Sequence, residues 1–138
     1  MSRRRWAICE TDGRVRFFIL TANENTAYNQ VRGDQLFIET NVDEPIAAQT
    51  HYYNLTLNTF QLKDDFPSIG QAVETITGGY RITLTQIPVG TWVVWPDGAV
   101  TLENDGFLEA EVEFPGNYWF EMEHPRYLEY TEIVDVQP

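Results

Sequence analysis

The chain has 138 residues, of which 43% are hydrophobic and 14% aromatic, enough for one packed domain or two small ones. Its formal charge of −12 disfavours binding to nucleic acid through a basic surface, because the phosphates would be repelled. A single cysteine excludes an internal disulfide and a multi-cysteine zinc site, and no run reaches the roughly 18 apolar residues of a membrane-spanning helix. We therefore expect a chain stabilised by packing, with no membrane insertion and no nucleic-acid partner.

The first predicted element is a β-hairpin around Asp12-Gly13. Strand-like runs stand on both sides of this pair, and Asp-Gly between such runs is a strong hairpin signal. A two-residue loop there places Ile8 opposite Phe17. The same register places Trp6 opposite Ile19, so the hairpin is predicted to have one apolar face, with Cys9 on the opposite one.

The rest of the N-terminal half is predicted to hold a helical turn and further strands. The polar residues 23–32 end at Gly33, which favours a short helix or structured loop capped by that glycine. Strand-like runs follow at 35–39, 50–55 and 59–62. The last two runs form a second hairpin that turns near Leu57-Asn58. We predict a small N-terminal β unit at residues 1–68, followed by a linker at 69–76.

The C-terminal half shows short strands separated by regular turn signals. Strand-like runs occupy residues 80–84, 91–95, 99–102, 107–114, 116–123 and 128–135. Turn residues such as Asn104-Asp105-Gly106 and Pro115-Gly116 separate them, a spacing typical of a sandwich or barrel. The predicted fold class is all-β, with an immunoglobulin-like β-sandwich at residues 77–138 that lacks the cysteine pair of antibody domains.

Alternation along the strands predicts which side chains are buried. The expected core side chains are Leu108, Ala110, Val112, Phe114, Tyr118, Phe120 and Met122. Treating the runs on either side of Pro115-Gly116 as neighbours in one sheet places the remaining side chains on one outer face. That face would hold Glu109, Glu111, Glu113, Trp119, Glu121 and Glu123. The alternation breaks near Thr131-Glu132, which predicts a bulge there.

The residues that could perform chemistry do not form a recognisable catalytic pattern. Cys9 and His51 could pair as nucleophile and base, but a lone cysteine in a strand is usually a packing residue. The acidic run 103–106 does not follow the spacing of a calcium loop and fits a turn. We expect no catalytic residues, no metal and no cofactor.

The candidate interface residues are charged, apart from one tryptophan. Five of the nine basic residues lie in the first sixteen positions, including Arg3, Arg4 and Arg5, whereas residues 76–138 hold eleven acids and two arginines. The arginines could meet an acidic neighbour, such as another copy's glutamates. Trp119 is the expected exposed aromatic anchor, because aromatic residues are enriched at protein contacts.

Two stretches resemble small accessory proteins encoded among the tail and tail-fibre genes of bacteriophages. They are Thr50-His51-Tyr52-Tyr53 leading to Asp65-Phe66-Pro67, and Phe114-Pro115-Gly116-Asn117-Tyr118 leading to His124-Pro125-Arg126-Tyr127-Leu128. The resemblance implies a structural protein of the virion, present in the host cytoplasm during assembly. It implies other virion proteins or copies of the chain as partners and no enzymatic activity.

Other functions remain open at this point. A carbohydrate-binding or host-adhesion module would use exposed aromatic rings to contact a host surface glycan. An acidic mimic of nucleic acid would use glutamates on alternate strand positions, about 6.6 Å apart, to inhibit a DNA-binding protein. A hydrolase is the least favoured alternative, because the many carboxylates give no specific pair.

Overall fold

The computed structural model of the protein describes residues 3–138. It is all-β, with 55% strand and 4% helix, which confirms the predicted class. The chain divides into two compact units, Met1–Asp64 (unit 1) and Asp65–Pro138 (unit 2).

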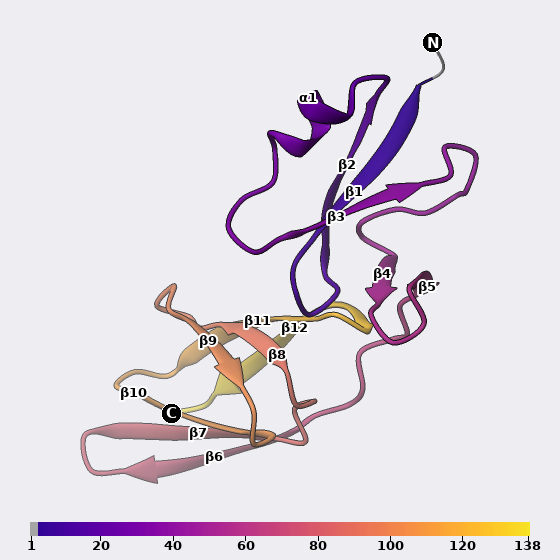
Figure 1. The fold of residues 1–138 in the computed structure, drawn as a ribbon. Helices are drawn as coiled ribbons and strands as arrows, with labels where there is room; N and C mark the ends of the chain where they lie inside the picture. Colours follow the sequence, from indigo (N-terminus) through magenta and orange to yellow (C-terminus); the bar gives the residue numbers. More distant parts are fainter. Residues whose placement is uncertain (1–2) are drawn as a thin grey trace. The chain divides into compact units, whose positions relative to one another are not determined.

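Unit 1 contains β1 (Arg4–Cys9), β2 (Val15–Thr21), α1 (Glu24–Tyr28), β3 (Leu36–Thr40), β4 (His51–Asn54) and β5 (Thr59–Leu62). Unit 2 contains β6 (Gly70–Ile76), β7 (Gly79–Thr85), β8 (Thr91–Val94), β9 (Val100–Glu103), β10 (Phe107–Val112), β11 (Gly116–His124) and β12 (Tyr127–Val136). Figure 1 shows these elements along the chain.

The main sheet of unit 1 has β1 in its centre, in the order β2-β1-β3. Ile8 pairs with Phe17 and Trp6 with Ile19, which confirms the predicted hairpin register. A bulge follows Ile8, so that Cys9 pairs with Val15. The extra residue is Arg16 of β2, and the bulge leaves the two predicted cross-strand pairs unchanged.

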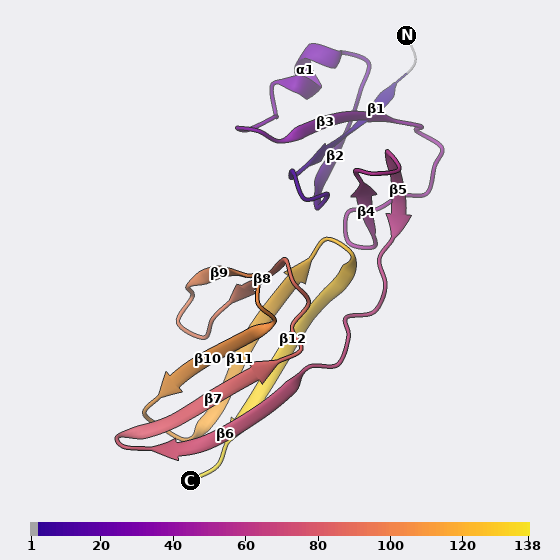
Figure 2. The same ribbon diagram turned by 60° about the horizontal axis from the view of Figure 1, so that its bottom comes forward.

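Both faces of this sheet are covered, whereas the sequence predicted one apolar face. On the face of Trp6, the Phe37 ring stacks at 5.9 Å and Tyr28 of α1 meets Phe37 edge-on at 5.4 Å. On the opposite face, Phe18 contacts Phe60 of β5 at 6.1 Å. Figures 1 and 2 show α1 and the β4–β5 hairpin on different sides of the sheet. Cys9 is therefore in a core and not at the surface.

Helix α1 is a single short segment that begins at a capping asparagine. The Oδ1 atom of Asn23 accepts hydrogen bonds from the backbone N–H groups of Asn25 and Thr26 at 2.9 and 3.3 Å. The helix ends at Tyr28, before the predicted end at Gly33, because the next backbone bonds are three-residue turns, such as Val31 N to Tyr28 O at 3.0 Å.

The predicted second hairpin is confirmed as β4–β5, and it contacts the turn of the first. Asn58 has a φ of 54° in its connection, a conformation that asparagine tolerates. The N–H of Tyr53 donates to the carbonyl oxygen of Gly13 at 2.9 Å, and Arg14 forms a β-bridge with Tyr52. These bonds hold the β4–β5 hairpin beside the Asp12-Gly13 turn.

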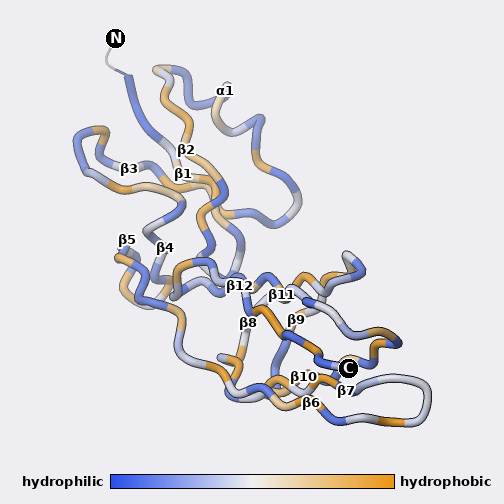
Figure 3. Tube along the Cα trace, turned by 180° about the vertical axis from the view of Figure 1, so that it is seen from behind, coloured by the Kyte–Doolittle hydropathy of each residue, from blue (hydrophilic) through white to orange (hydrophobic). Residues whose placement is uncertain are grey.

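Unit 2 contains two antiparallel sheets that share one core. The strand orders are β10-β7-β6 and β12-β11-β8-β9 (Figure 2). The buried core side chains are Ile82, Leu84, Ile87, Val93, Leu108, Phe120, Met122, Val134 and Val136. They come from both sheets, and Figure 3 shows β8 as a hydrophobic stretch of the trace. The expected burial of Leu108, Phe120 and Met122 is confirmed.

The predicted linker at residues 69–76 is wrong, because residues 70–76 form strand β6. This strand pairs along its whole length with β7, and Gly78 has a φ of 86° in the connection between them. Strand β6 is at the edge of its sheet, and five of its seven residues are exposed. An edge strand with few buried side chains does not show the apolar alternation that marks a strand in a sequence.

The predicted single face of glutamates is also wrong. Strands β10 and β11 follow each other in the chain but belong to different sheets. Glu109 and Glu111 therefore lie on the sheet of β7, and Glu113 follows the end of β10. Trp119, Glu121 and Glu123 lie on the sheet of β8 and β12. The continuous acidic surface that a nucleic-acid mimic would need is thus divided.

Two smaller expectations about unit 2 also require correction. Phe114 is 69% exposed and not in the core, because β10 ends before it at Val112. The bulge lies near the start of β12, where Leu128 and Glu129 stand opposite the single residue between Met122 and His124, and not at Thr131-Glu132. The alternation near Glu132 breaks for another reason, since this glutamate faces inward and is buried.

Candidate functional site

The outward side of the four-stranded sheet in unit 2 carries a group of exposed and partly buried apolar side chains. We call this group the outer apolar face, and it consists of Trp92, Val94, Val100, Leu102, Trp119 and Ile133. The strand register forms three pairs: Trp119 with Ile133, Val94 with Val100, and Trp92 with Leu102. On the same face, Glu121 and Glu123 of β11 lie opposite Val94 and Trp92. Trp119 and Val100 are each 58% exposed, and Ile133 is 51% exposed.

These side chains face outward because their neighbours in the strands are buried. Phe120 follows Trp119 in β11 and is fully buried in the core. Val93, between Trp92 and Val94 in β8, is fully buried too. Successive side chains of a strand point to opposite sides, so burial of one set fixes the other set on the surface.

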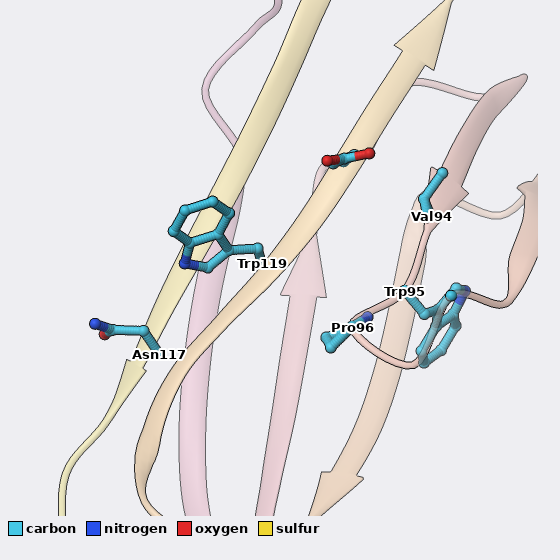
Figure 4. A pocket seen from close by; sticks show the side chains of 7 residues that line it. Val94, Trp95, Pro96, Asn117 and Trp119 are labelled. Atoms are coloured by element: carbon cyan, nitrogen blue, oxygen red, sulfur yellow. The ribbon is translucent and has the colours of Figure 1, made fainter.

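A shallow pocket of about 440 Å³ opens beside Trp119 (Figure 4). Its lining includes Val94, Trp95, Pro96, Asn117, Trp119 and Glu121. Trp95 lies at the inner side of this region, where its ring meets Phe120 at 6.0 Å and its Nε1 atom donates to Thr101 Oγ1 at 2.7 Å. Trp119 instead projects from β11 on the outer side, as the close view shows.

The pocket is bordered by negative charge. Glu121 follows Trp119 by two positions in β11 and is exposed, and within residues 3–138 no basic side chain forms an ion pair with it. Arg81 is on the other sheet, where it bonds Glu74 and Glu111. The bond to Glu74 is the main reason that the pKa of Arg81 is raised.

The predicted arginine site lies in unit 1, and two of its three residues have partners within that unit. Arg4 forms two hydrogen bonds with Glu39, one of them 3.0 Å from Nη2 to Oε1, and its guanidinium lies 4.7 Å from the ring centre of Trp6. The bond raises the pKa of Arg4 and lowers that of Glu39. Arg3 is exposed.

Arg5 is held by the segment that follows β3. Its guanidinium donates to Thr40 Oγ1 at 2.7 Å and to the backbone oxygens of Asn41 and Glu44 at 2.6 and 2.8 Å. It also lies 5.1 Å from the ring centre of Phe18. These contacts give Arg4 and Arg5 a structural role in tying the start of β1 to β3 and the following loop.

The candidate nucleophile of the sequence does not have the environment of one. Cys9 is fully buried, and desolvation raises the pKa of its thiol to about 12, which disfavours the reactive thiolate. The ring of His51 contacts Thr50 Oγ1 at 2.8 Å, and its Nδ1 atom accepts from the N–H of Ala47 at 3.2 Å. The acidic run 103–106 forms a turn in which Asp105 accepts from the N–H of Phe107 at 3.2 Å.

The sequence identified Trp119 as an exposed aromatic but missed the other members of the outer apolar face. The run 91–95 is apolar at both even and odd positions, so periodicity does not show which side is buried. Val100 and Leu102 form their own short alternation, and its exposed side follows only from the pairing with β8. The sequence signal that could have indicated this surface is a strand that is apolar at both even and odd positions, because such a strand places apolar side chains on both sides of its sheet.

Within residues 3–138, no three His, Cys, Asp or Glu side chains group in a way that could hold a metal ion. No helix in this part of the chain combines the length and the apolar character needed to cross a membrane. Comparison of the chain with models of protein families, with curated proteins and with solved structures found no match.

Proposed function

We propose that the chain is a non-enzymatic structural protein of a bacteriophage particle that acts by protein–protein assembly. Its contact surface is the outer apolar face of unit 2, and this surface is the observation that carries the proposal. The resemblance of the sequence to tail-associated accessory proteins supports a location in the virion, with the chain present in the host cytoplasm during assembly. The partners are other virion proteins or further copies of the chain.

The proposal includes an immunoglobulin-like β-sandwich as the fold of unit 2. In its support, the first, second and fifth strands form one sheet, and the third, fourth, sixth and seventh form the other. The hydroxyl of Tyr118, near the start of the sixth strand, donates to the carbonyl oxygen of Phe114 at 2.6 Å. A tyrosine that bonds backwards to the chain at this corner is a hallmark of such sandwiches.

The energetic argument rests on exposed apolar area. A large apolar side chain contributes about 1.5–3 kcal/mol when it is moved completely out of water. Trp119, Ile133 and Val100 each keep more than half of their surface exposed, so covering them together can stabilise a complex by several kcal/mol. Contiguous exposed apolar side chains with polar groups around them mark interaction sites.

The test is incorporation of the chain into purified particles, measured by quantitative mass spectrometry. Cells that supply Trp119→Ala in place of the natural chain should give particles with much less of it. The matched control is Phe114→Ala, which removes an exposed aromatic ring that lies outside the outer apolar face. Absence of the natural chain from the particles would reject the assignment to the virion. Equal incorporation of both variants would reject the outer apolar face as the contact surface.

A second candidate is binding to a host surface glycan, which the pocket beside Trp119 favours. An exposed indole next to the amide of Asn117 and the carboxylate of Glu121 offers a sugar a stacking surface and hydrogen-bonding groups. On a glycan array, the natural chain should bind a defined group of sugars, and Trp119→Ala should not. Binding that persists in this variant would remove the candidate.

A further inference from the structure

We propose that Trp119 and Glu121 form an acceptor site for an arginine side chain of a protein partner. The outer apolar face then meets a basic protein segment, with one arginine stacked on the indole and bonded to the carboxylate. The inference rests on the proposed assembly function and adds the chemistry of the partner to it.

Unit 1 contains the same combination of side chains with its arginine in place. Arg4 lies 4.7 Å from the ring centre of Trp6 and forms two hydrogen bonds with Glu39. Glu39 is directly opposite Trp6 in the neighbouring strand, so that both project on the same face. A tryptophan and a glutamate on one sheet face thus already bind a guanidinium in this protein.

In unit 2 the tryptophan and the glutamate are present on one face. Trp119 and Glu121 are two positions apart in β11, which separates them by about 6.6 Å along the strand. A guanidinium over an indole lies within about 6 Å of the ring centre, so its N–H groups can reach a carboxylate at that separation. The pocket lined by Trp119, Glu121 and Pro96 provides the room for it.

The cation must come from outside unit 2. Residues 65–138 contain thirteen acidic side chains and two basic ones, Arg81 and Arg126. Arg81 is held by Glu74 and Glu111 on the other sheet, and Arg126 lies in the turn between β11 and β12. A basic partner is therefore complementary in charge to this unit, and an acidic one would be repelled.

Arginine fits the site better than lysine. Its guanidinium is planar, stacks on aromatic rings and offers parallel N–H groups that match a carboxylate. A lysine ammonium is a point charge and cannot use both features at once. The site should therefore discriminate between two side chains of equal charge.

The experiment titrates the ¹⁵N-labelled full chain with capped Gly-Ser peptides that contain arginine, lysine or citrulline at the same positions. The arginine peptide should shift the Trp119 indole signal and the amide signals of β8 and β11. Binding should be weaker for lysine and lost for citrulline, which keeps the planar shape without the charge. Added salt should weaken the binding of the arginine peptide.

Three variants test the residues. Trp119→Leu should lower the affinity for the arginine peptide by about two- to fivefold, the factor expected for one exposed cation–π contact. Glu121→Gln should weaken it as well, whereas the matched control Glu109→Gln, with the same charge change on the other sheet, should not. Equal affinity for arginine and lysine peptides, or shifts centred on β7 and β10, would overturn the inference.

The outcome for the arginine site can be separated from that for assembly. Loss of particle incorporation in Trp119→Ala together with no peptide binding would keep the assembly function and reject the arginine site. Peptide binding with normal incorporation would reject the assembly function as the role of this face. Indole shifts that depend on protein concentration alone would identify a second copy, and not a separate basic partner, as the occupant.

Discussion

Gln71 donates a hydrogen bond of 2.7 Å from Nε2 to the Oε1 atom of Glu132, and this bond joins the edge strands of the two sheets in unit 2. The hydroxyl of Tyr130 donates to the other carboxylate oxygen. Glu132 is only 7% exposed, so these bonds replace much of its contact with water. A charged side chain pointing inward from an edge strand also hinders that edge from pairing with a foreign strand.

Replacement of Tyr130 by phenylalanine should lower the free energy of unfolding by about 1 kcal/mol, because the Glu132 carboxylate loses a donor while it stays buried. Urea denaturation of the variant and the natural chain measures the difference. Tyr127→Phe is the matched control, since it removes a hydroxyl for which residues 3–138 provide no hydrogen bond. Equal losses in the two variants would contradict the importance of the contact.

The same tyrosine should contribute to the loss of stability at alkaline pH. The bond to Glu132 raises the pKa of Tyr130 above its ordinary value of 10.0. The folded state therefore holds this proton more tightly than the unfolded state, and the contribution is complete below pH 10 and is lost as the pH rises through the folded-state value. Stability of Tyr130→Phe, measured from pH 9 upward, should fall less steeply than that of the natural chain.

The thiol of Cys9 should be almost unreactive in the folded chain. Burial raises its pKa to about 12 from an ordinary 9.0, so little thiolate is present at pH 8, and reagents cannot reach it. Reaction with Ellman's reagent should be slow in buffer and fast in denaturing urea. Rapid reaction without denaturant would show that the core around Cys9 opens readily.

Gly13 should be the least replaceable glycine of unit 1. It has a φ of 97°, and a Cβ atom there would lie 2.3 Å from the backbone oxygen of Tyr53. Gly33 also has a positive φ, 56°, but open space around it, so Gly33→Ala should cost only the roughly 1–2 kcal/mol of a left-handed conformation. Gly13→Ala should cost clearly more by urea denaturation, and a cost no larger than that of Gly33→Ala would contradict the close approach.

The bond from Tyr118 to the Phe114 carbonyl should stabilise the connection between β10 and β11. Tyr118→Phe keeps the ring in the core and removes only this 2.6 Å bond, for an expected loss of about 0.5–1.5 kcal/mol in thermal or urea unfolding. Tyr80→Phe is the control, because Tyr80 also packs on the core but its hydroxyl has no hydrogen bond within residues 3–138. If Tyr118→Phe left the free energy of unfolding unchanged, a stabilising role for this hydrogen bond would be contradicted.

Sequence reasoning predicted local structure well where the signal was local. The Asp12-Gly13 turn set the pairs of the first hairpin, and the alternation in β11 identified Phe120 as buried and Trp119 as exposed. Each of these follows from the residues of one turn or one strand.

The errors arose where the burial or the sheet position of a side chain depends on a segment that is not its neighbour in the sequence. Glu111 and Glu121 were expected on one face, but a short connection through Pro115 crosses from one sheet to the other. Cys9 was expected outside the core, and it is buried by the β4–β5 hairpin, which is more than forty positions away in the sequence. Alternation along a strand shows which side chains share a face, but it does not show which other part of the chain covers that face.

The buried position of Cys9 has a practical value for the study of this protein. It is the only cysteine of the chain, and its thiol is fully buried, so the natural chain should react little with thiol reagents at neutral pH. A cysteine introduced at Asn117, beside Trp119, would then be the one site that takes a photocrosslinker or a spin label. A partner could be mapped through it without first removing the native residue.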